Sequence, residues 1–211
     1  GDVVQDLVRT GQGMKIWDFI KGSLNLSPGR LARICEVGCA SGSNLSYIQS
    51  QLKSQGISCE LFGTEFETNH AASASQKGIH VKTDDVNSLS GFGVPFDLII
   101  LSHLFEHLPD PQGALRLLRP LLSPGGCLFI EVPGIRNLGM YHFDLLDYLV
   151  HAHLFQFDLA SLQGLVERNG FKMVKGDETV RILLTVGQGK SPSEGAAESM
   201  LEYLNQLEDN W

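Results

Sequence analysis

Short apolar runs alternate with segments of helical periodicity over most of the chain. Five runs are rich in apolar side chains, and each is followed by glycine, proline or a polar residue; they cover residues 31–37, 58–64, 79–82, 96–101 and 127–132. Between them, apolar residues recur at helical spacing in segments 44–52, 69–76 and 111–122. Segment 123–126, which reads Ser-Pro-Gly-Gly, predicts a turn before the last of these runs. Strands that alternate with helices in this way predict an α/β fold with a doubly wound, Rossmann-like sheet.

The C-terminal part of the pattern departs from this alternation. A helix over 158–168, with Asp158 as its N-cap, precedes strands at 171–175 and 179–186. Because only three residues separate these two strands, they must form a hairpin, and one of them is antiparallel to the rest. We therefore expect a seven-stranded sheet, mostly parallel, with an antiparallel hairpin at its C-terminal end.

The chain divides into three parts. Residues 1–30 form an N-terminal helical segment, in which we expect two short helices because Gly11 and Gly13 interrupt the helical spacing. Residues 31–186 hold the alternating strands and helices and form the main domain. Residues 187–211 are an acidic linker followed by a terminal helix.

The charge balance argues against some classes of partner. The 211 residues include 16 Lys and Arg against 24 Asp and Glu, which gives a formal net charge of −8. The basic residues form no cluster along the chain, so we expect no nucleic-acid partner. The apolar runs are also too short to cross a bilayer, and we expect no membrane span.

Four cysteines bear on the cellular compartment, namely Cys35, Cys39, Cys59 and Cys127. They form no CxxC pair, and three lie inside or beside apolar runs, so we expect buried free thiols rather than a zinc site. Free thiols fit a reducing compartment, which here is the cytoplasm. No signal peptide is visible, although the chain begins at Gly1 rather than methionine, which we interpret as a trimmed chain or an excised domain.

Candidate chemistry gathers where the first strands end, which is the edge at which open α/β sheets bind ligands. Glu36 precedes a turn in which Gly38 and Gly42 allow the backbone to approach a ligand closely. Because Ala40 lies between these glycines, the turn differs from the GxGxxG pattern of dinucleotide-binding proteins. A carboxylate at this point suits a ligand with an ammonium and a sulfonium better than a pyrophosphate.

Acidic residues also follow the next two strands. Glu65 can accept hydrogen bonds from both hydroxyls of a ribose, and Phe66 beside it can pack against an adenine ring. After the third strand, Asp85 offers an acceptor for an exocyclic amine, and Val86 offers a backbone N–H for a ring nitrogen. Together these groups describe a site for an adenosine that carries a positive charge.

These residues resemble the motifs of class I S-adenosylmethionine-dependent methyltransferases. The resemblance rests on segments 36–42, 96–111 and 118–126 and on Glu65 and Asp85, and it covers about residues 31–186. It implies that S-adenosyl-L-methionine is the cofactor and S-adenosyl-L-homocysteine the product. The cofactor-binding residues that it implies are Glu36, Gly38, Cys39, Ala40, Gly42, Glu65, Phe66, Asp85, Val86, Ser102 and His103. Ala40 departs from the glycine that is common in the family.

A histidine is the expected general base, because methyl transfer to a hydroxyl requires removal of a proton and imidazoles in general exchange protons near neutral pH. His103 lies just past the fourth strand. His151 and His153 lie in an insertion at 134–157, which we interpret as a lid over the substrate. These three histidines are the catalytic candidates, while for His103 a cofactor contact or no role also stays open. We interpret His107 as a residue that structures its loop.

The pair His151 and His153 could place both rings on one side of an extended segment, as two metal ligands would require. In the insertion, however, only Asp144 and Asp147 offer carboxylates near them. We therefore expect no metal site.

Segment 151–157 and the helix after it resemble a subgroup of the family that has a histidine-rich insertion before the last helix. Members of that subgroup act on sugars, on lipid or polysaccharide intermediates, on quinones or on small metabolites. The sequence lacks the signatures of nucleobase amino-group and cytosine C5 methylation, so we expect in-line transfer to an oxygen or carbon of a small-molecule or saccharide acceptor. Two alternatives stay open: a non-catalytic S-adenosylmethionine-binding domain of a larger protein, and a nicotinamide-dependent oxidoreductase with the same sheet topology.

Overall fold

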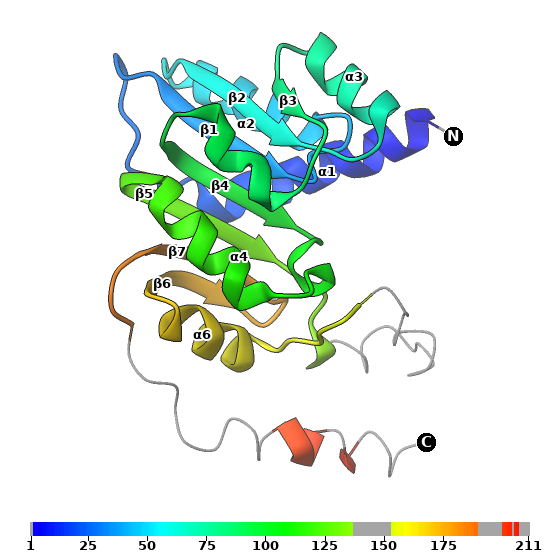
Figure 1. Cartoon of the computed structure of the whole chain (residues 1–211), viewed down its shortest axis with the longest axis vertical. Coiled ribbons are helices and arrows are strands. Elements are labelled where there is room, and N and C mark those ends of the chain that lie inside the picture. Colours follow the sequence, from blue (N-terminus) through cyan, green and yellow to red (C-terminus); the bar gives the residue numbers. More distant parts are fainter. Residues whose placement is uncertain (1, 137–152, 190–199, 204, 207–211) are drawn as a thin grey trace.

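The structure is a computed structural model that describes residues 2–136, 153–189, 200–203 and 205–206. Its centre is a seven-stranded sheet in the order β3-β2-β1-β4-β5-β7-β6 (Figure 1). The strands are β1 (Ala32–Val37), β2 (Cys59–Thr64), β3 (His80–Lys82), β4 (Phe96–Ser102), β5 (Leu122–Glu131), β6 (Phe171–Asp177) and β7 (Arg181–Val186). Strands β1 to β5 pair in parallel, while β7 is antiparallel to both β5 and β6. The predicted sheet with its C-terminal antiparallel hairpin is confirmed.

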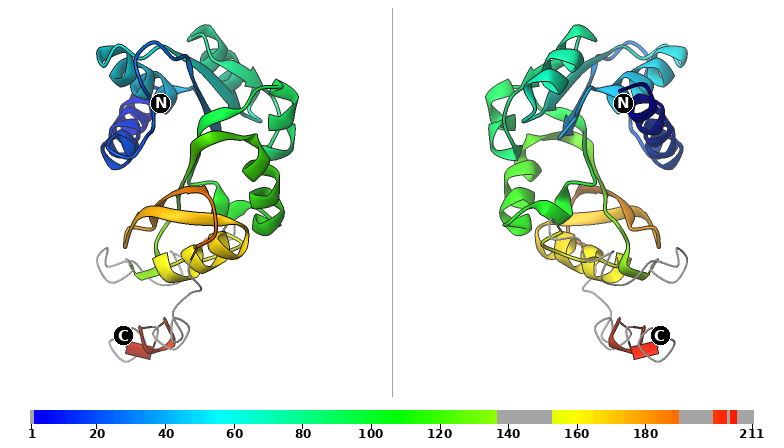
Figure 2. Two further views of the ribbon diagram at one scale, coloured as in Figure 1. Left: turned by 90° about the vertical axis from the view of Figure 1, so that its left-hand side faces the viewer. Right: turned by 90° about the vertical axis from the view of Figure 1, so that its right-hand side faces the viewer.

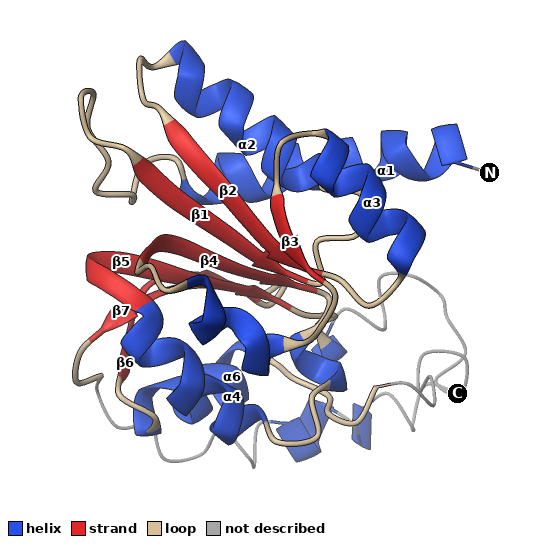
Figure 3. Cartoon of the chain, turned by 45° about the horizontal axis from the view of Figure 1, so that its top comes forward, coloured by secondary structure: helices blue, strands red, loops and turns tan. Residues whose placement is uncertain are grey.

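Helices cover both faces of the sheet (Figures 2 and 3). One face carries α1 (Asp2–Ile20), α2 (Ser43–Ser54) and α3 (Thr68–Gln76), and the other carries α4 (Pro111–Leu118) and α6 (Leu159–Arg168). The 3-10 helices η1 (Val86–Phe92), η2 (Phe105–His107) and η3 (Arg119–Leu121) lie in the connections. Two apolar cores result, and the adjacent β4 residues Ile99 and Ile100 belong to opposite cores. A strand buried on both faces accounts for the continuous apolar run seen in its sequence.

One continuous helix replaces the two short helices expected at the N-terminus. Helix α1 runs through Gly11 and Gly13 without interruption. A Cβ atom at Gly13 would lie 3.1 Å from Asn44 Cα and 3.1 Å from Tyr47 Cβ of α2, whereas a Cβ atom at Gly11 would meet nothing within 4 Å. Gly13 therefore allows the two helices to pack closely, and it does not end a helix.

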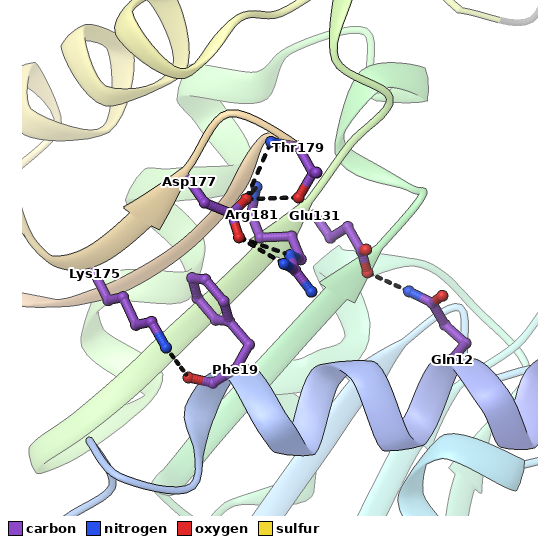
Figure 4. Close-up of polar contacts among 7 residues, drawn as sticks. All are labelled: Gln12, Phe19, Glu131, Lys175, Asp177, Thr179 and Arg181. Atoms are coloured by element: carbon purple, nitrogen blue, oxygen red, sulfur yellow. Dashed lines mark hydrogen bonds and ion pairs between the residues drawn. The ribbon is translucent and has the colours of Figure 1, made fainter. Parts of the chain in front are cut away.

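Polar contacts fasten α1 to the β5–β7–β6 side of the sheet (Figure 4). Lys175 Nζ donates a 3.0 Å hydrogen bond to the main-chain oxygen of Phe19 and lies 4.4 Å from the centre of the Phe19 ring. One to two turns closer to the N-terminus, Gln12 Nε2 donates to Ser102 Oγ at 3.3 Å and to the Glu131 carboxylate. Because Ser102 and Glu131 end β4 and β5, these contacts hold α1 beside the carboxyl ends of both strands.

Segment 123–126, which we expected to form a turn, lies inside β5 as a bulge. The pairing of β5 with β4 skips from Leu122 to Cys127, and Gly125 within the bulge has a φ of +78°. Strand β5 therefore begins earlier than predicted, and α4 ends at Leu118. The proline and glycines that suggested a turn instead make the first part of β5 irregular.

The two ends of the 134–157 insertion meet beside α6. Gly134 and Phe157 form a parallel β-bridge, and most of the insertion, residues 137–152, lies outside the described residues. Asp158 caps α6 as predicted, because its carboxylate accepts a 2.8 Å hydrogen bond from Ser161 N. Arg136 Nε donates to the same carboxylate at 3.1 Å.

The four cysteines are free, as the sequence predicts, and three of them are buried. Burial raises the pKa of the Cys35 thiol well above its usual range. Within the described part of the chain, no helix combines the length and apolar character needed to cross a membrane.

Candidate functional site

The carboxyl ends of four parallel strands lie in one row. In the register of the sheet, Thr64 of β2 pairs with Lys82 of β3 and with Val37 of β1. Val37 pairs in turn with Leu101 of β4. The residues that follow these positions therefore gather at one edge of the sheet, where ligands of open α/β folds bind. All the cofactor-binding residues predicted from the sequence follow or adjoin one of these strand ends.

The loop between β1 and α2 has a left-handed backbone at three positions. Gly38, Ala40 and Gly42 have φ angles of 70°, 47° and 77°. A Cβ atom at Gly42 would lie 2.2 Å from Ile79 Cδ1, so both the backbone conformation and the available space favour glycine there. Glu36, buried near the end of β1, accepts a 2.7 Å hydrogen bond from Asn44 Nδ2 of α2. This bond fixes the carboxylate beside the loop.

Glu65 joins the end of β2 to the β1–α2 loop. Its Oε2 accepts a 2.7 Å hydrogen bond from Ala40 N, and its Oε1 accepts a 2.9 Å hydrogen bond from Glu67 N. The side chain is half-buried, and each oxygen keeps a lone pair for a further donor such as a ribose hydroxyl. Phe66 beside it is 69% exposed, so its ring is open to a ligand.

Asp85, which was predicted to accept from the exocyclic amine of an adenine, caps a 3-10 helix in the structure. Its carboxylate caps η1 by accepting from Asn87 N at 2.7 Å and from Asn87 Nδ2 at 2.9 Å. The side chain of Val86 is buried in the core beneath η1. The position that the sequence assigned to the adenine end is therefore a capped, well-packed turn.

Cys39 packs into the same loop as a neutral thiol. Burial, followed by the nearby charges of Glu36 and Glu65, raises its pKa to about 12. A Cβ atom at Gly63 would lie 2.5 Å from Cys39 Sγ, so the absence of a side chain in β2 makes room for this thiol.

Two residues that the sequence analysis missed face Ser102. Glu131 Oε2 accepts a 3.1 Å hydrogen bond from Ser102 Oγ, and Gln12 of α1 donates to both side chains. Glu131 is the penultimate residue of the apolar run 127–132, as Glu36 is of the run 31–37, and it could have been found by the same signal. Gln12 carries no comparable signal, because its position depends on how α1 docks.

A buried carboxylate surrounded by histidines lies just past β4. The Glu106 side chain is 2% exposed, and its Oε1 lies 3.6 Å from His107 Nε2, 4.0 Å from His103 Nδ1 and 4.0 Å from His153 Nε2. Burial raises the pKa of Glu106, against the smaller lowering effects of its own backbone N–H group and of the three imidazoles. The cluster thus brings the end of β4 together with His153, the first described residue after 137–152.

His103 is held in a strained conformation. Its φ is +52°, its N–H donates a 2.9 Å hydrogen bond to the main-chain oxygen of Glu131, and its side chain is 51% exposed. Such strain in a residue other than glycine is concentrated at functional sites. Of the other two catalytic candidates, His153 lies in the Glu106 cluster and His151 lies outside the described residues. His107, interpreted from the sequence as a loop residue, belongs to the same cluster.

Comparisons with known proteins bear on this geometry. A ubiquinone biosynthesis O-methyltransferase of Parvibaculum lavamentivorans is 29% identical over 99 residues, which are 46% of this chain and 39% of that protein. The chain thus spans well under two thirds of the length of this curated relative. Two solved structures are similar in fold. The plantazolicin methyltransferase BpumL with S-adenosylhomocysteine has a TM-score of 0.66 at 15% identity, covering 87% of this chain and 85% of that one. The CurJ carbon methyltransferase has a TM-score of 0.60 at 20% identity, covering 85% and 54%.

The family itself is decided by a match that spans most of the chain. The family described as methyltransferase domain matches residues 18–175, from the second half of α1 to β6. This range includes the β1–α2 loop, the row of strand ends and the Glu106 cluster. The chain therefore belongs to the methyltransferase-domain family and is, in family and fold, a class I S-adenosylmethionine-dependent methyltransferase.

Proposed function

We propose that this protein transfers a methyl group from S-adenosylmethionine to an oxygen or a carbon of a small-molecule or glycan-like acceptor. The family match and the fold support the reaction class. The names of its relatives include an O-methyltransferase and a carbon methyltransferase, in keeping with either acceptor atom. The four free thiols fit a cytoplasmic location.

The observation that carries the proposal is the row of aligned strand ends and the acceptors that follow it. Glu36, Glu65 and Asp85 present carboxylates after or beside three neighbouring strands, at the edge where the glycine loop exposes its backbone. A ligand with a positive charge, a ribose and a base meets complementary groups in that order. A pyrophosphate would instead meet repulsion from the Glu36 carboxylate.

The residues present fit the cofactor. Glu65 keeps free lone pairs for the ribose hydroxyls, Phe66 offers an open ring to the adenine, and the positive-φ loop allows close backbone approach. Ser102 and His103 lie at the end of β4, on the side assigned to the methionine moiety. When bound, S-adenosylmethionine supplies a methyl carbon already activated by its sulfonium, and S-adenosylhomocysteine is the product.

The chain's own task is then to align the acceptor and, for a hydroxyl, to remove its proton. Alignment of a nucleophile can account for roughly 7–11 kcal/mol of the barrier, and a general base for about 10²–10⁴-fold in rate. His103 is half exposed at the strand end, so its imidazole is accessible to an acceptor proton. The hydrogen bond from Gln12 to Glu131 holds α1 beside the same edge.

The proposal is tested by measuring S-adenosylhomocysteine binding and methyl transfer to a panel of catechol, quinol and saccharide acceptors. His103→Ala should keep cofactor affinity and lose activity by about 10²-fold or more. His70→Ala is the matched control, because His70 lies on α3, pairs with Glu67 and is not among the predicted catalytic or cofactor-binding residues. Cofactor binding without transfer to any acceptor would instead favour a non-catalytic S-adenosylmethionine-binding domain.

A further inference from the structure

Three side chains in the described part of the chain could hold a metal ion together. Glu106 and His107 come from η2, and His153 comes from the chain just before α6. One donor atom from each lies within 4.8 Å of the others. The ring centres of His107 and His153 are 4.9 Å apart, and the ring planes make an angle of 65°.

The state of the Glu106 carboxylate is an independent sign of a missing partner. The side chain is 2% exposed, and neither of its oxygens has a hydrogen-bond partner among the described residues. His153 Nδ1 is likewise buried without a hydrogen bond in that part of the chain. Buried polar atoms are almost always paired, and an unpaired buried carboxylate is strongly destabilising. At 3.6 and 4.0 Å, the imidazole nitrogens are too far from Oε1 to be hydrogen-bonded to it.

We propose that Glu106, His107 and His153 bind a divalent transition-metal ion of the Zn²⁺ class. Two imidazoles and one carboxylate form a donor set typical of Zn²⁺ sites that keep a position open, whereas Mg²⁺ and Ca²⁺ prefer oxygen donors throughout. Donor atoms bound to one tetrahedral Zn²⁺ lie roughly 3.3 Å apart. Side-chain movements of about 1.5 Å or less would therefore close the site from its present spacing of up to 4.8 Å.

The sequence alone argues against this site, because the only carboxylates of the 134–157 insertion are Asp144 and Asp147. The fold supplies a carboxylate from a different segment. The main-chain oxygen of Glu106 accepts hydrogen bonds from Leu154 N at 3.0 Å and Phe155 N at 3.2 Å. These bonds hold His153 beside η2 before any ion binds. The entropy cost of ordering the ligands on metal binding is therefore reduced.

Metal binding by this site does not depend on methyl transfer, but its use in the reaction rests on the proposed function. Glu106, His107 and His153 would hold the ion, and the ion would supply a Lewis acid that lowers the pKa of an acceptor hydroxyl. The acceptor oxygen then forms its bond to the methyl carbon, the carbon–sulfur bond breaks with its electron pair on sulfur, and the hydroxyl proton passes to His103. In this assignment His153 is a ligand and His103 is the base.

The test uses the whole chain after treatment with a chelator and its removal. Titration with Zn²⁺ in a calorimeter should give one site per chain, and Co²⁺ should give visible absorption bands of imidazole coordination. Glu106→Gln and His153→Ala should each weaken Zn²⁺ binding by more than about a hundredfold. His80→Ala is the control, because His80 lies on β3 against Phe62 and should bind Zn²⁺ like the original chain.

S-adenosylhomocysteine binding, measured on the same samples, shows that a variant is folded and separates the two proposals. Retained cofactor affinity with lost Zn²⁺ binding in both variants supports the metal site. Equal Zn²⁺ binding by the original chain and both variants overturns it, as does Mg²⁺ binding as tight as Zn²⁺ binding. Failure of the original chain to bind S-adenosylhomocysteine would overturn the proposed function and leave the metal result intact.

Discussion

Replacement of Glu65 by alanine tests the proposed cofactor site at the residue that joins two of its loops. In the structure the carboxylate already accepts hydrogen bonds from Ala40 N and Glu67 N, at 2.7 and 2.9 Å. In the complex, we expect its remaining lone pairs to accept the two ribose hydroxyls. The substitution therefore removes both ribose acceptors and releases the left-handed turn at Ala40, where φ is +47°.

The expected loss follows from the kind of bond involved. A hydrogen bond to a charged group contributes about 1.5–3 kcal/mol, so two lost ribose contacts amount to about 3–6 kcal/mol. Since about 1.4 kcal/mol corresponds to a tenfold change, affinity for S-adenosylhomocysteine should fall roughly 10²–10⁴-fold. Fold stability should fall less, because the carboxylate is only half-buried and solvent can replace part of the lost bonding.

Calorimetric titration with S-adenosylhomocysteine measures the affinity, and thermal melting measures the fold. Glu67→Ala is the matched control, because it removes a neighbouring exposed carboxylate that caps α3 but keeps the backbone N–H that Glu65 accepts. This control should lose a little stability, because α3 loses its N-cap, and should keep its affinity for S-adenosylhomocysteine. An unchanged dissociation constant in Glu65→Ala, with a normal melt, would refute the assignment of Glu65 to the ribose.

Two further predictions concern stability. Gly11→Ala should stabilise the protein by about 0.5–1 kcal/mol, because alanine has a higher helix propensity than glycine. Gly13→Ala should destabilise it, because the new Cβ atom would lie 3.1 Å from atoms of α2. Thermal melts of the two variants measure both effects, and equal shifts in melting temperature would contradict the packing role of Gly13. Burial raises the pKa of Asp158, but hydrogen bonds from Ser161 and the charge of Arg136 outweigh it and leave the pKa lowered. A carboxylate with a lowered pKa stabilises the fold fully only above the ordinary carboxyl pKa. The original chain should therefore exceed Asp158→Asn in free energy of unfolding most at about pH 7, and this difference should shrink below about pH 4. Urea unfolding at both pH values measures it.

Local pattern was sufficient for the elements and their order. The run 96–101 was expected as a buried strand and forms β4, and the three-residue gap before 179–186 predicted the antiparallel hairpin that β6 and β7 form. Local pattern failed where packing between elements decides. The pattern predicted a helix break near Gly13, but Gly13 lies inside α1 and allows it to pack closely against α2. The pattern also predicted a turn at 123–126, but this segment pairs irregularly with β4 as a bulge of β5.

The candidate site divides in the same way. The sequence by itself located Glu36, Glu65 and Asp85, because strand ends can be recognised locally and parallel strands bring those ends to one edge. Only the tertiary structure placed Gln12 against Glu131, 119 positions away, and His153 within 4.0 Å of the Glu106 carboxylate. Such pairs depend on how distant segments dock onto the sheet, and periodicity along the chain carries no information about that docking.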